Sequence, residues 1–212
     1  MDKIGRLSAE YSAPIWLCKK WCNEYGDEKT ETALRESLGS VPIFVRVNTT
    51  KTDPEELMSI LEEENVKAVL VDEIPDAIRI YSAAPQATKA YKKGLFHVQD
   101  ISSQLCAKAV GAQKGERVLD VCSAPGGKTF TVAELMENEG EITSCDLHEH
   151  RCELIDKNAI RLGIDIIKTK VNDASVENSE FVDKKHFCMS NISIVILVIA
   201  LFLSTFFYMS NQ

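Results

Sequence analysis

Apolar residues recur at two different spacings over the second half of the chain. Short apolar runs at 118–121, 141–146 and 164–171 predict buried strands. Between them, apolar residues recur at helical spacing over 129–137 and 148–162. Strands that alternate with helices of this length indicate a parallel sheet with right-handed connections. We therefore expect an α/β fold in this part of the chain.

The first half shows a different order of elements. Helical spacing predicts helices over 11–25 and 28–38, and Gly39 ends the second. The segment Thr52-Asp53-Pro54-Glu55 is a capping box that opens a helix through Glu64. Strands are predicted at 41–48, 67–71 and 77–81. Residues 1–84 are thus expected to form a small α+β module, followed by a polar linker and a helix over 85–110, and by the α/β domain over 111–185.

A glycine-rich turn follows the strand at 118–121. Its candidate cofactor-binding residues are Cys122, Ser123, Ala124, Pro125, Gly126, Gly127 and Lys128. The glycines allow the backbone to approach a ligand closely, and the start of the next helix offers free N–H groups. Strand, turn and helix together predict a site for a nucleotide-like cofactor.

Three cofactors compete for this turn. A phosphate-binding loop needs Gly-x-x-x-x-Gly-Lys-Ser/Thr, but Cys122 stands where the first glycine belongs. The dinucleotide fingerprint Gly-x-Gly-x-x-Gly is absent. S-adenosylmethionine is favoured because Asp146 ends the next strand, roughly 20 residues after the glycines, where a carboxylate can bind ribose hydroxyls. A purely structural turn remains the alternative.

The run Asp120-Val121-Cys122-Ser123-Ala124-Pro125-Gly126-Gly127-Lys128-Thr129 resembles the cofactor motif of the RsmB/Sun/Fmu ribosomal RNA cytosine-C5 methyltransferases. The segment His97 to Leu105 resembles the one that these proteins carry just before it, and the likeness extends over about 7–185. The resemblance implies a partial Rossmann-like class I methyltransferase sheet, S-adenosylmethionine as cofactor and ribosomal RNA as partner. It also implies that Asp173 borders the adenine. The alternative for Asp173 is an Asx turn in a loop.

Two groups of residues are candidates for RNA contact. In the resembled family an α+β module helps to hold RNA, and Arg46 and Asn48 of the Arg-Val-Asn motif would contact it. Their alternative roles are a charge at a strand end and a turn-forming amide. Basic residues beside an aromatic ring can follow a phosphate backbone and stack a base. Lys89, Lys92 and Lys93 with Tyr91 show this pattern, with a solvated linker as the alternative.

The chemistry that the resemblance implies needs a cysteine thiolate that adds to carbon 6 of cytosine. The family carries its two cysteines in Asp-Ala-Pro-Cys-Ser-Gly-like and Thr-Cys-Ser-like motifs, and this sequence contains neither. Cys188 lacks the proline, acidic and glycine neighbours of those motifs, so we do not assign it as the nucleophile. We therefore expect this chain to bind the cofactor weakly and to transfer no methyl group by itself.

An apolar tail over 186–212 ends the sequence. Residues 192–208 carry no charge and reach the lower limit of the ~17–25 residues that span a bilayer, which predicts a membrane helix with the folded part in the cytoplasm. In the alternative, Ile192 to Val198 supplies a missing fourth strand of the sheet. A membrane-tethered RNA-binding scaffold without catalysis is accordingly the second functional hypothesis.

Composition narrows these possibilities. The net charge of −8 excludes a protein that binds nucleic acid through overall charge, so any RNA contact needs a local patch. Seven cysteines without paired spacing argue against a metal site and are typical of reduced thiols in a cytosolic protein. Cys18 and Cys22 lie four residues apart on a predicted helix, where free cysteines pack as small apolar side chains.

Overall fold

The computed structural model describes residues 2–39, 42–72, 74–81, 84–176, 181 and 185–187. The chain divides into two compact units, Met1–Pro42 and Ile43–Gln212. The boundary lies inside the α+β module that the sequence predicted over residues 1–84. The reason is that the N-terminal helices bury their apolar side chains among themselves, while the strands after Pro42 belong to a separate core.

Three helices make up the first unit: α1 (Lys3–Glu10), α2 (Ile15–Tyr25) and α3 (Asp27–Ser37). The Asp2 side chain caps α1 by accepting a hydrogen bond from the Gly5 N–H. The core of this unit contains Leu7, Cys18 and Leu34, and Cys22 packs against it. The packing role expected for the two cysteines is confirmed, whereas α1 was not predicted from the sequence.

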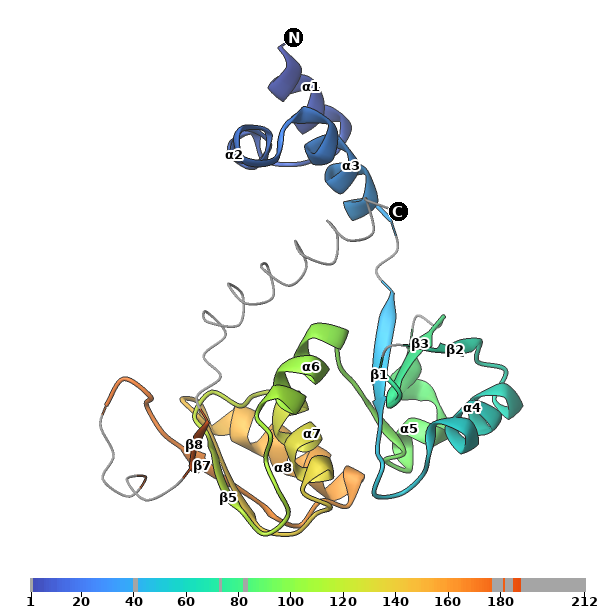
Figure 1. Ribbon diagram of the computed structural model, residues 1–212, viewed down its shortest axis with the longest axis vertical. Coiled ribbons are helices and arrows are strands. Elements are labelled where there is room, and N and C mark those ends of the chain that lie inside the picture. Colours follow the sequence, from blue (N-terminus) through green and yellow to red (C-terminus); the bar gives the residue numbers. More distant parts are fainter. Residues whose placement is uncertain are drawn as a thin grey trace. The chain divides into compact units, whose positions relative to one another are not determined.

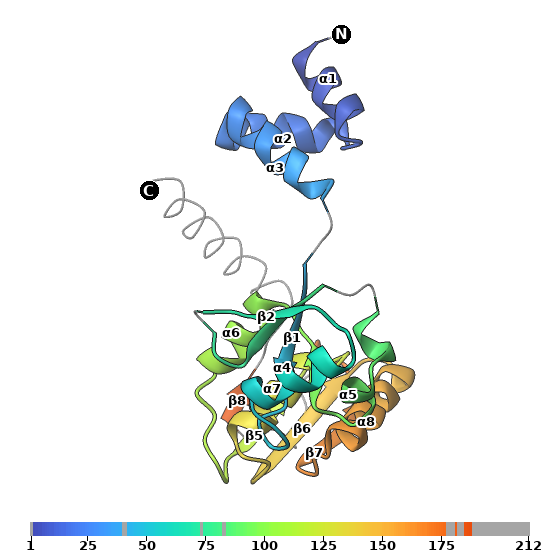
Figure 2. The same ribbon diagram turned by 90° about the vertical axis from the view of Figure 1, so that its right-hand side faces the viewer.

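An antiparallel module occupies residues 43–98 of the second unit. It contains β1 (Ile43–Val47), α4 (Pro54–Glu63), β2 (Ala68–Leu70), β3 (Ala77–Ile80), the 3-10 turn η1 (Pro85–Ala87), α5 (Lys89–Lys92) and β4 (Phe96–Val98). The strand order is β2-β3-β1-β4, and every pair is antiparallel. Helices α4 and α5 cover one face of this sheet (Figure 2), where Leu57 and Ala90 join the strand side chains in one core.

The polar linker expected at the start of 85–110 is not observed, because residues 85–94 are folded into the antiparallel module. Pro85 and Ala90 are buried, and Thr88 caps α5 by accepting a hydrogen bond from the Tyr91 N–H. The next residues form β4, which pairs with β1 through Val47 and Phe96. The antiparallel module is therefore complete only at Val98, beyond the limit predicted at residue 84.

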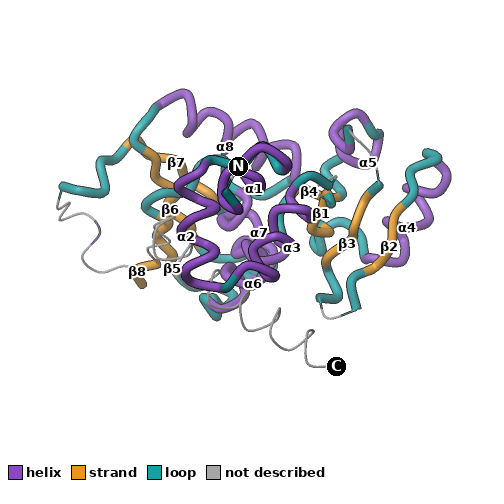
Figure 3. Tube along the Cα trace, turned by 90° about the horizontal axis from the view of Figure 1, so that it is seen from above, coloured by secondary structure: helices purple, strands orange, loops and turns teal. Residues whose placement is uncertain are grey.

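The parallel-sheet domain follows, from residue 101 to residue 187. Its elements are α6 (Ile101–Ala109), β5 (Arg117–Asp120), α7 (Gly127–Leu135), β6 (Glu141–Asp146), α8 (Glu149–Leu162), β7 (Ile167–Val171) and β8 (Lys185–Phe187). The strands run parallel in the order β7-β6-β5-β8. Figures 1 and 3 show α6 and α7 between this sheet and the antiparallel sheet. The predicted α/β fold with a parallel sheet is confirmed.

The strand beside β5 differs from one sequence hypothesis. Lys185–Phe187 pairs with β5 in parallel and holds the place of the fourth strand. Ile192 to Val198, the segment of the sequence hypothesis, lies outside the described residues. The remaining tail, including Cys188 and the membrane helix predicted over 192–208, lies outside the described residues. Within the ranges that the structure describes, no helix is long and apolar enough to cross a membrane.

Candidate cofactor site

The site begins where β5 ends and α7 begins. Asp120, the last residue of β5, accepts hydrogen bonds from the Thr129 hydroxyl at 2.7 Å and from the Cys122 N–H at 3.4 Å. Burial raises the pKa of the Asp120 carboxyl, and the hydrogen bond from Thr129 opposes this shift. Asp120 therefore joins the end of the strand to the first turn of the helix, and so fixes both ends of the turn between them.

The turn itself is shaped by Gly126, which caps α7 with a left-handed φ of 101°. A Cβ atom at this position would lie 2.3 Å from Cζ of Phe130, so only glycine fits. Gly127 starts the helix, and the peptide bond before Pro125 is cis. The predicted residues Pro125, Gly126, Gly127 and Lys128 lie in the turn and the helix start but do not line the pocket beside them.

Ser123 of the turn is hydrogen-bonded within the protein. Its hydroxyl donates to the Cys145 carbonyl at 2.8 Å and accepts a hydrogen bond from the Ser144 hydroxyl at 2.7 Å. Its N–H also donates to the Cys145 carbonyl, and its carbonyl accepts from the Gly126 N–H. Since Ser123 is 4% exposed and these bonds lie within the protein, it ties the turn to β6.

A pocket of about 290 Å³ lies at the carboxyl ends of β5, β6 and β7. Four of the predicted residues line it together: Cys122, Ala124, Asp146 and Asp173. Small-molecule sites start at about 300 Å³, so the pocket has the size of a compact ligand site. Ligands of open parallel sheets bind at this edge. The sequence prediction that these residues meet at the strand ends agrees with the geometry.

Asp146 is held firmly at the pocket. One carboxylate oxygen accepts the His148 N–H at 3.2 Å, and the other lies 3.5 Å from an Arg151 nitrogen. The carboxylate is 7% exposed, while the Arg151 side chain is 49% exposed. The exposed arginine can move at little cost, which would leave an oriented carboxylate free to accept ligand hydroxyls.

Asp173 forms the Asx turn that the sequence offered as one alternative. Its Oδ1 accepts hydrogen bonds from the Ser175 hydroxyl and N–H, which is the Asx turn, and these bonds lower the pKa of the Asp173 carboxyl. The residue also lines the pocket.

Sequence reasoning missed the other lining residues. All except Arg151 lie within two residues of a predicted position, so proximity to the strand ends was the available signal. They are Val121, Leu147, His148, Arg151, Asn172 and Ala174.

The prediction that Arg46 and Asn48 contact RNA is wrong, because both side chains are buried inside the second unit. Arg46 is 4% exposed, and its Nε lies 2.7 Å from a Glu134 carboxylate oxygen on α7. Its terminal nitrogen also pairs with Asp76 at 3.3 Å. Asn48 is fully buried and donates to the carbonyls of Gly94 and Leu162, each at 2.8 Å.

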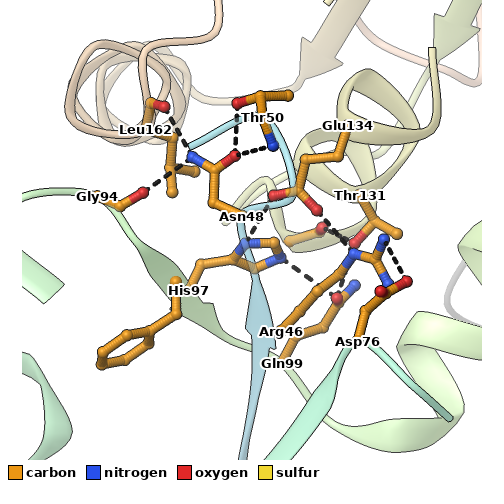
Figure 4. Close-up of polar contacts among 12 residues, drawn as sticks. Arg46, Asn48, Thr50, Asp76, Gly94, His97, Gln99, Thr131, Glu134 and Leu162 are labelled. Carbon is orange, nitrogen blue, oxygen red and sulfur yellow. Dashed lines mark hydrogen bonds and ion pairs between the residues drawn. The ribbon is translucent and has the colours of Figure 1, made fainter. Parts of the chain in front are cut away.

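These contacts join the antiparallel module to α7, through Glu134, and to α8, through Leu162, as Figure 4 shows. His97 lies 3.4 Å from Glu134 through Nδ1, and the Thr131 hydroxyl donates to the Gln99 side chain at 2.7 Å. The side chains of Arg46 and His97 thus both lie next to the Glu134 carboxylate on α7. We call Arg46, Asn48, His97, Gln99, Thr131 and Glu134 the buried joint. Its position explains why the Arg-Val-Asn motif is structural rather than a surface contact.

The basic segment around Tyr91 is also different from its prediction. Lys89, Lys92 and Lys93 are exposed, but the Arg161 guanidinium lies 3.7 Å from the centre of the Tyr91 ring. Arg161 also donates to the Tyr91 carbonyl at 2.8 Å. Since Arg161 covers a face of the ring, Tyr91 is a packing residue and not a base-stacking platform.

No group of three or more histidine, cysteine, aspartate or glutamate side chains that could hold a metal ion is present in the described part of the chain.

Two sequence families match the chain in consecutive stretches. The family described as 16S rRNA methyltransferase RsmB/F matches residues 107–188, which contain the pocket. The family described as the RsmF/B-like ferredoxin-like domain matches residues 13–86. Both family models describe domains of RsmB/F-type methyltransferases.

The chain belongs to the RsmB/F methyltransferase family.

Its relatives are longer proteins. The chain is 38% identical over 185 residues to the probable ribosomal RNA small subunit methyltransferase B of Bacillus subtilis strain 168, covering 85% of this chain and 41% of that protein. It is 32% identical over 165 residues to the ribosomal RNA small subunit methyltransferase B of Escherichia coli strain SE11, covering 77% of this chain and 38% of that protein. The chain spans about two fifths of the length of these curated relatives.

Solved structures show the same fold. A methyltransferase homolog protein from Pyrococcus horikoshii superimposes with a TM-score of 0.72 at 23% identity, covering 82% of this chain and 57% of that one. NSun6 from the same organism gives a TM-score of 0.70 at 19% identity, covering 76% of this chain and 66% of that one. These two likenesses concern the fold alone.

Proposed function

We propose that this chain is the cofactor-binding part of a ribosomal RNA (cytosine-C5) methyltransferase and that its pocket binds S-adenosylmethionine. The observation that carries the proposal is the position of Asp146, whose oriented carboxylate lines one pocket with Cys122 and Ala124 of the glycine turn. A carboxylate at the end of the second strand is suited to the ribose hydroxyls of a nucleoside. The RsmB/F family membership supports the methyl donor over other nucleosides.

The residues fit this group in three respects. The pocket volume of about 290 Å³ is close to that of the smallest ligand sites, and Cys122 and Ala124 of the turn line it. Neither a pyrophosphate-binding fingerprint nor a complete phosphate-binding loop is present in the sequence. In the proposed arrangement Asp146 holds the ribose and Asp173 borders the adenine. When bound, the cofactor supplies the methyl group.

We expect S-adenosylhomocysteine to bind the wild-type chain in a calorimetric titration and to bind the Asp146→Ala variant at least tenfold more weakly. A carboxylate that accepts hydrogen bonds from two hydroxyls contributes on the order of 1.5–3 kcal/mol, which corresponds to about 10- to 150-fold in affinity. Asp165→Ala is the matched control, since it removes an exposed carboxylate away from the pocket and should leave the affinity unchanged.

Titration with ATP in parallel separates the nucleoside hypotheses. The proposal predicts heat with S-adenosylhomocysteine and none with ATP. Equal affinity of the wild type and the Asp146→Ala variant for S-adenosylhomocysteine would contradict the assignment of Asp146 to the cofactor site. Because the cysteine motifs are missing from this sequence, transfer of a tritiated methyl group to ribosomal RNA should remain at background.

A further inference from the structure

The antiparallel sheet has an unpaired edge at β2. The strand order is β2-β3-β1-β4, so β2 (Ala68–Leu70) lies on the outer side of β3, as Figure 3 shows. Among the described residues, no strand pairs with the other side of β2. An edge strand keeps a row of backbone N–H and C=O groups that can pair with a further strand. The outer side of β2 is therefore open to strand addition.

The hydrogen bonds to β3 determine which backbone groups of β2 face outward. The Tyr81 N–H donates to the Lys67 carbonyl at 2.9 Å, so the backbone groups of Lys67 point toward β3. The direction of these groups alternates along an antiparallel strand. Those of Val69 therefore point toward β3 again, whereas the N–H and C=O groups of Ala68 and Leu70 point away from it.

The side chains along this edge are apolar and accessible. Val69 is 40% exposed and Leu70 is 44% exposed, and residues 68–71 contain neither a charge nor a proline. Charged residues, lysine above all, commonly protect an edge strand from pairing. β7, at the edge of the parallel sheet, contains Lys168 and Lys170. β2 lacks the protection that β7 has.

Segment 67–72 is complementary to a second copy of itself. A two-fold axis through Val69, perpendicular to the sheet, pairs Ala68 of each copy with Leu70 of the other. The outward-facing groups of such a pair exchange both N–H···O bonds. The segment begins with the basic Lys67 and ends with the acidic Asp72, both exposed. Antiparallel pairing therefore brings the basic end of each copy to the acidic end of the other.

We propose that two copies of this chain associate through their β2 edges, with Val69 of one copy directly opposite Val69 of the other. The two antiparallel sheets then form one continuous sheet across the axis. A strand as short as β2 buries a small area on pairing, so the dimer is weak and transient rather than obligate. The inference is independent of the cofactor, because β2 contributes no residue to the pocket.

Dimerisation depends on protein concentration by mass action, so sedimentation equilibrium of the full chain over about 1–300 µM tests the proposal. The wild type should shift from monomer toward dimer over this range. Val69→Lys should raise the dissociation constant about tenfold or more, because it places two ammonium groups directly opposite each other. Val69→Glu should have the same effect through two carboxylates.

A mixture of the two charged variants gives the sharpest result. Equal amounts of Val69→Lys and Val69→Glu should form a heterodimer, because each lysine then lies opposite a glutamate. Damage to the fold of either variant cannot produce this rescue. Circular dichroism verifies that each variant is folded on its own.

Ile160→Lys is the matched control. Ile160 lies on α8 of the parallel-sheet domain and is 80% exposed, twice as much as Val69. The same substitution at this more exposed apolar residue should leave the dissociation constant unchanged, because Ile160 takes no part in the pairing of β2.

Three outcomes would overturn the proposal. The wild type could remain a monomer over the whole concentration range. Ile160→Lys could weaken the association as much as Val69→Lys does, which would assign it to apolar exposure in general. Finally, the mixture of the two charged variants could stay monomeric, which would show that Val69 does not lie opposite its own copy.

Discussion

Replacing Arg46 by methionine is expected to lower the free energy of unfolding of the second unit by about 3–5 kcal/mol. The side chains of Arg46 and Glu134 are 5% and 0% exposed, and their Nε and Oε2 atoms lie 2.7 Å apart. Methionine keeps most of the volume but leaves the Glu134 carboxylate buried without its strongest partner. The cost is the desolvation of that uncompensated charge. Urea denaturation of the full chain measures it.

Lys168→Met provides the matched control for this prediction. Lys168 pairs with Glu141 at the same 2.7 Å, but its side chain is 72% exposed. Solvent screens that pair, so its loss should cost less than about 1 kcal/mol. The double variant Arg46→Met/Glu134→Leu should be more stable than Arg46→Met alone, because neither charge then stays buried. Equal effects of Arg46→Met and Lys168→Met would contradict the buried joint.

Gly126→Ala is expected to abolish detectable binding of S-adenosylhomocysteine and to destabilise the second unit by about 2–5 kcal/mol. Two causes add. An alanine at a φ of 101° is strained, and its Cβ would lie 2.3 Å from Cζ of Phe130. Phe130 is 3% exposed and packs edge-on against His97, so it has no free space to move into. The turn would have to move, and the pocket wall with it.

Gly115→Ala separates the two causes. Gly115 has a similar φ of 83°, but a Cβ there meets nothing within 4 Å. We expect it to cost only the backbone strain, about 1–3 kcal/mol, and to leave the affinity for S-adenosylhomocysteine unchanged. Thermal unfolding and calorimetry on both variants measure the two effects. A Gly126→Ala protein that binds the ligand like Gly115→Ala would show that the turn does not shape the site.

The parallel sheet could be predicted from the sequence because its signals are local. Buried parallel strands appear as apolar runs, and the connecting helices show their own period. The pocket could be predicted in the same way, because Cys122 follows one predicted strand and Asp146 ends the next, and such strand ends meet at one edge of a sheet. Predicting the positions of these residues required no knowledge of partners that are distant in the sequence.

The buried joint could not be predicted in this way. Arg46 and Glu134 are 88 residues apart in the sequence, and the residues around each of them do not indicate that the two side chains pair. Arginine is rarely buried unless it is paired, so an exposed role was the natural expectation. β4 was missed because it has only three residues, one of which is the buried His97. The environment that makes these residues structural forms only when the two sheets pack around α7.

A crystal structure of this chain with S-adenosylhomocysteine tests the central claim most directly. We predict that the ligand occupies the pocket, with both ribose hydroxyls within about 3 Å of the Asp146 carboxylate and Arg151 moved away from it. A ligand bound elsewhere, or one in the pocket whose ribose does not contact Asp146, would contradict the account.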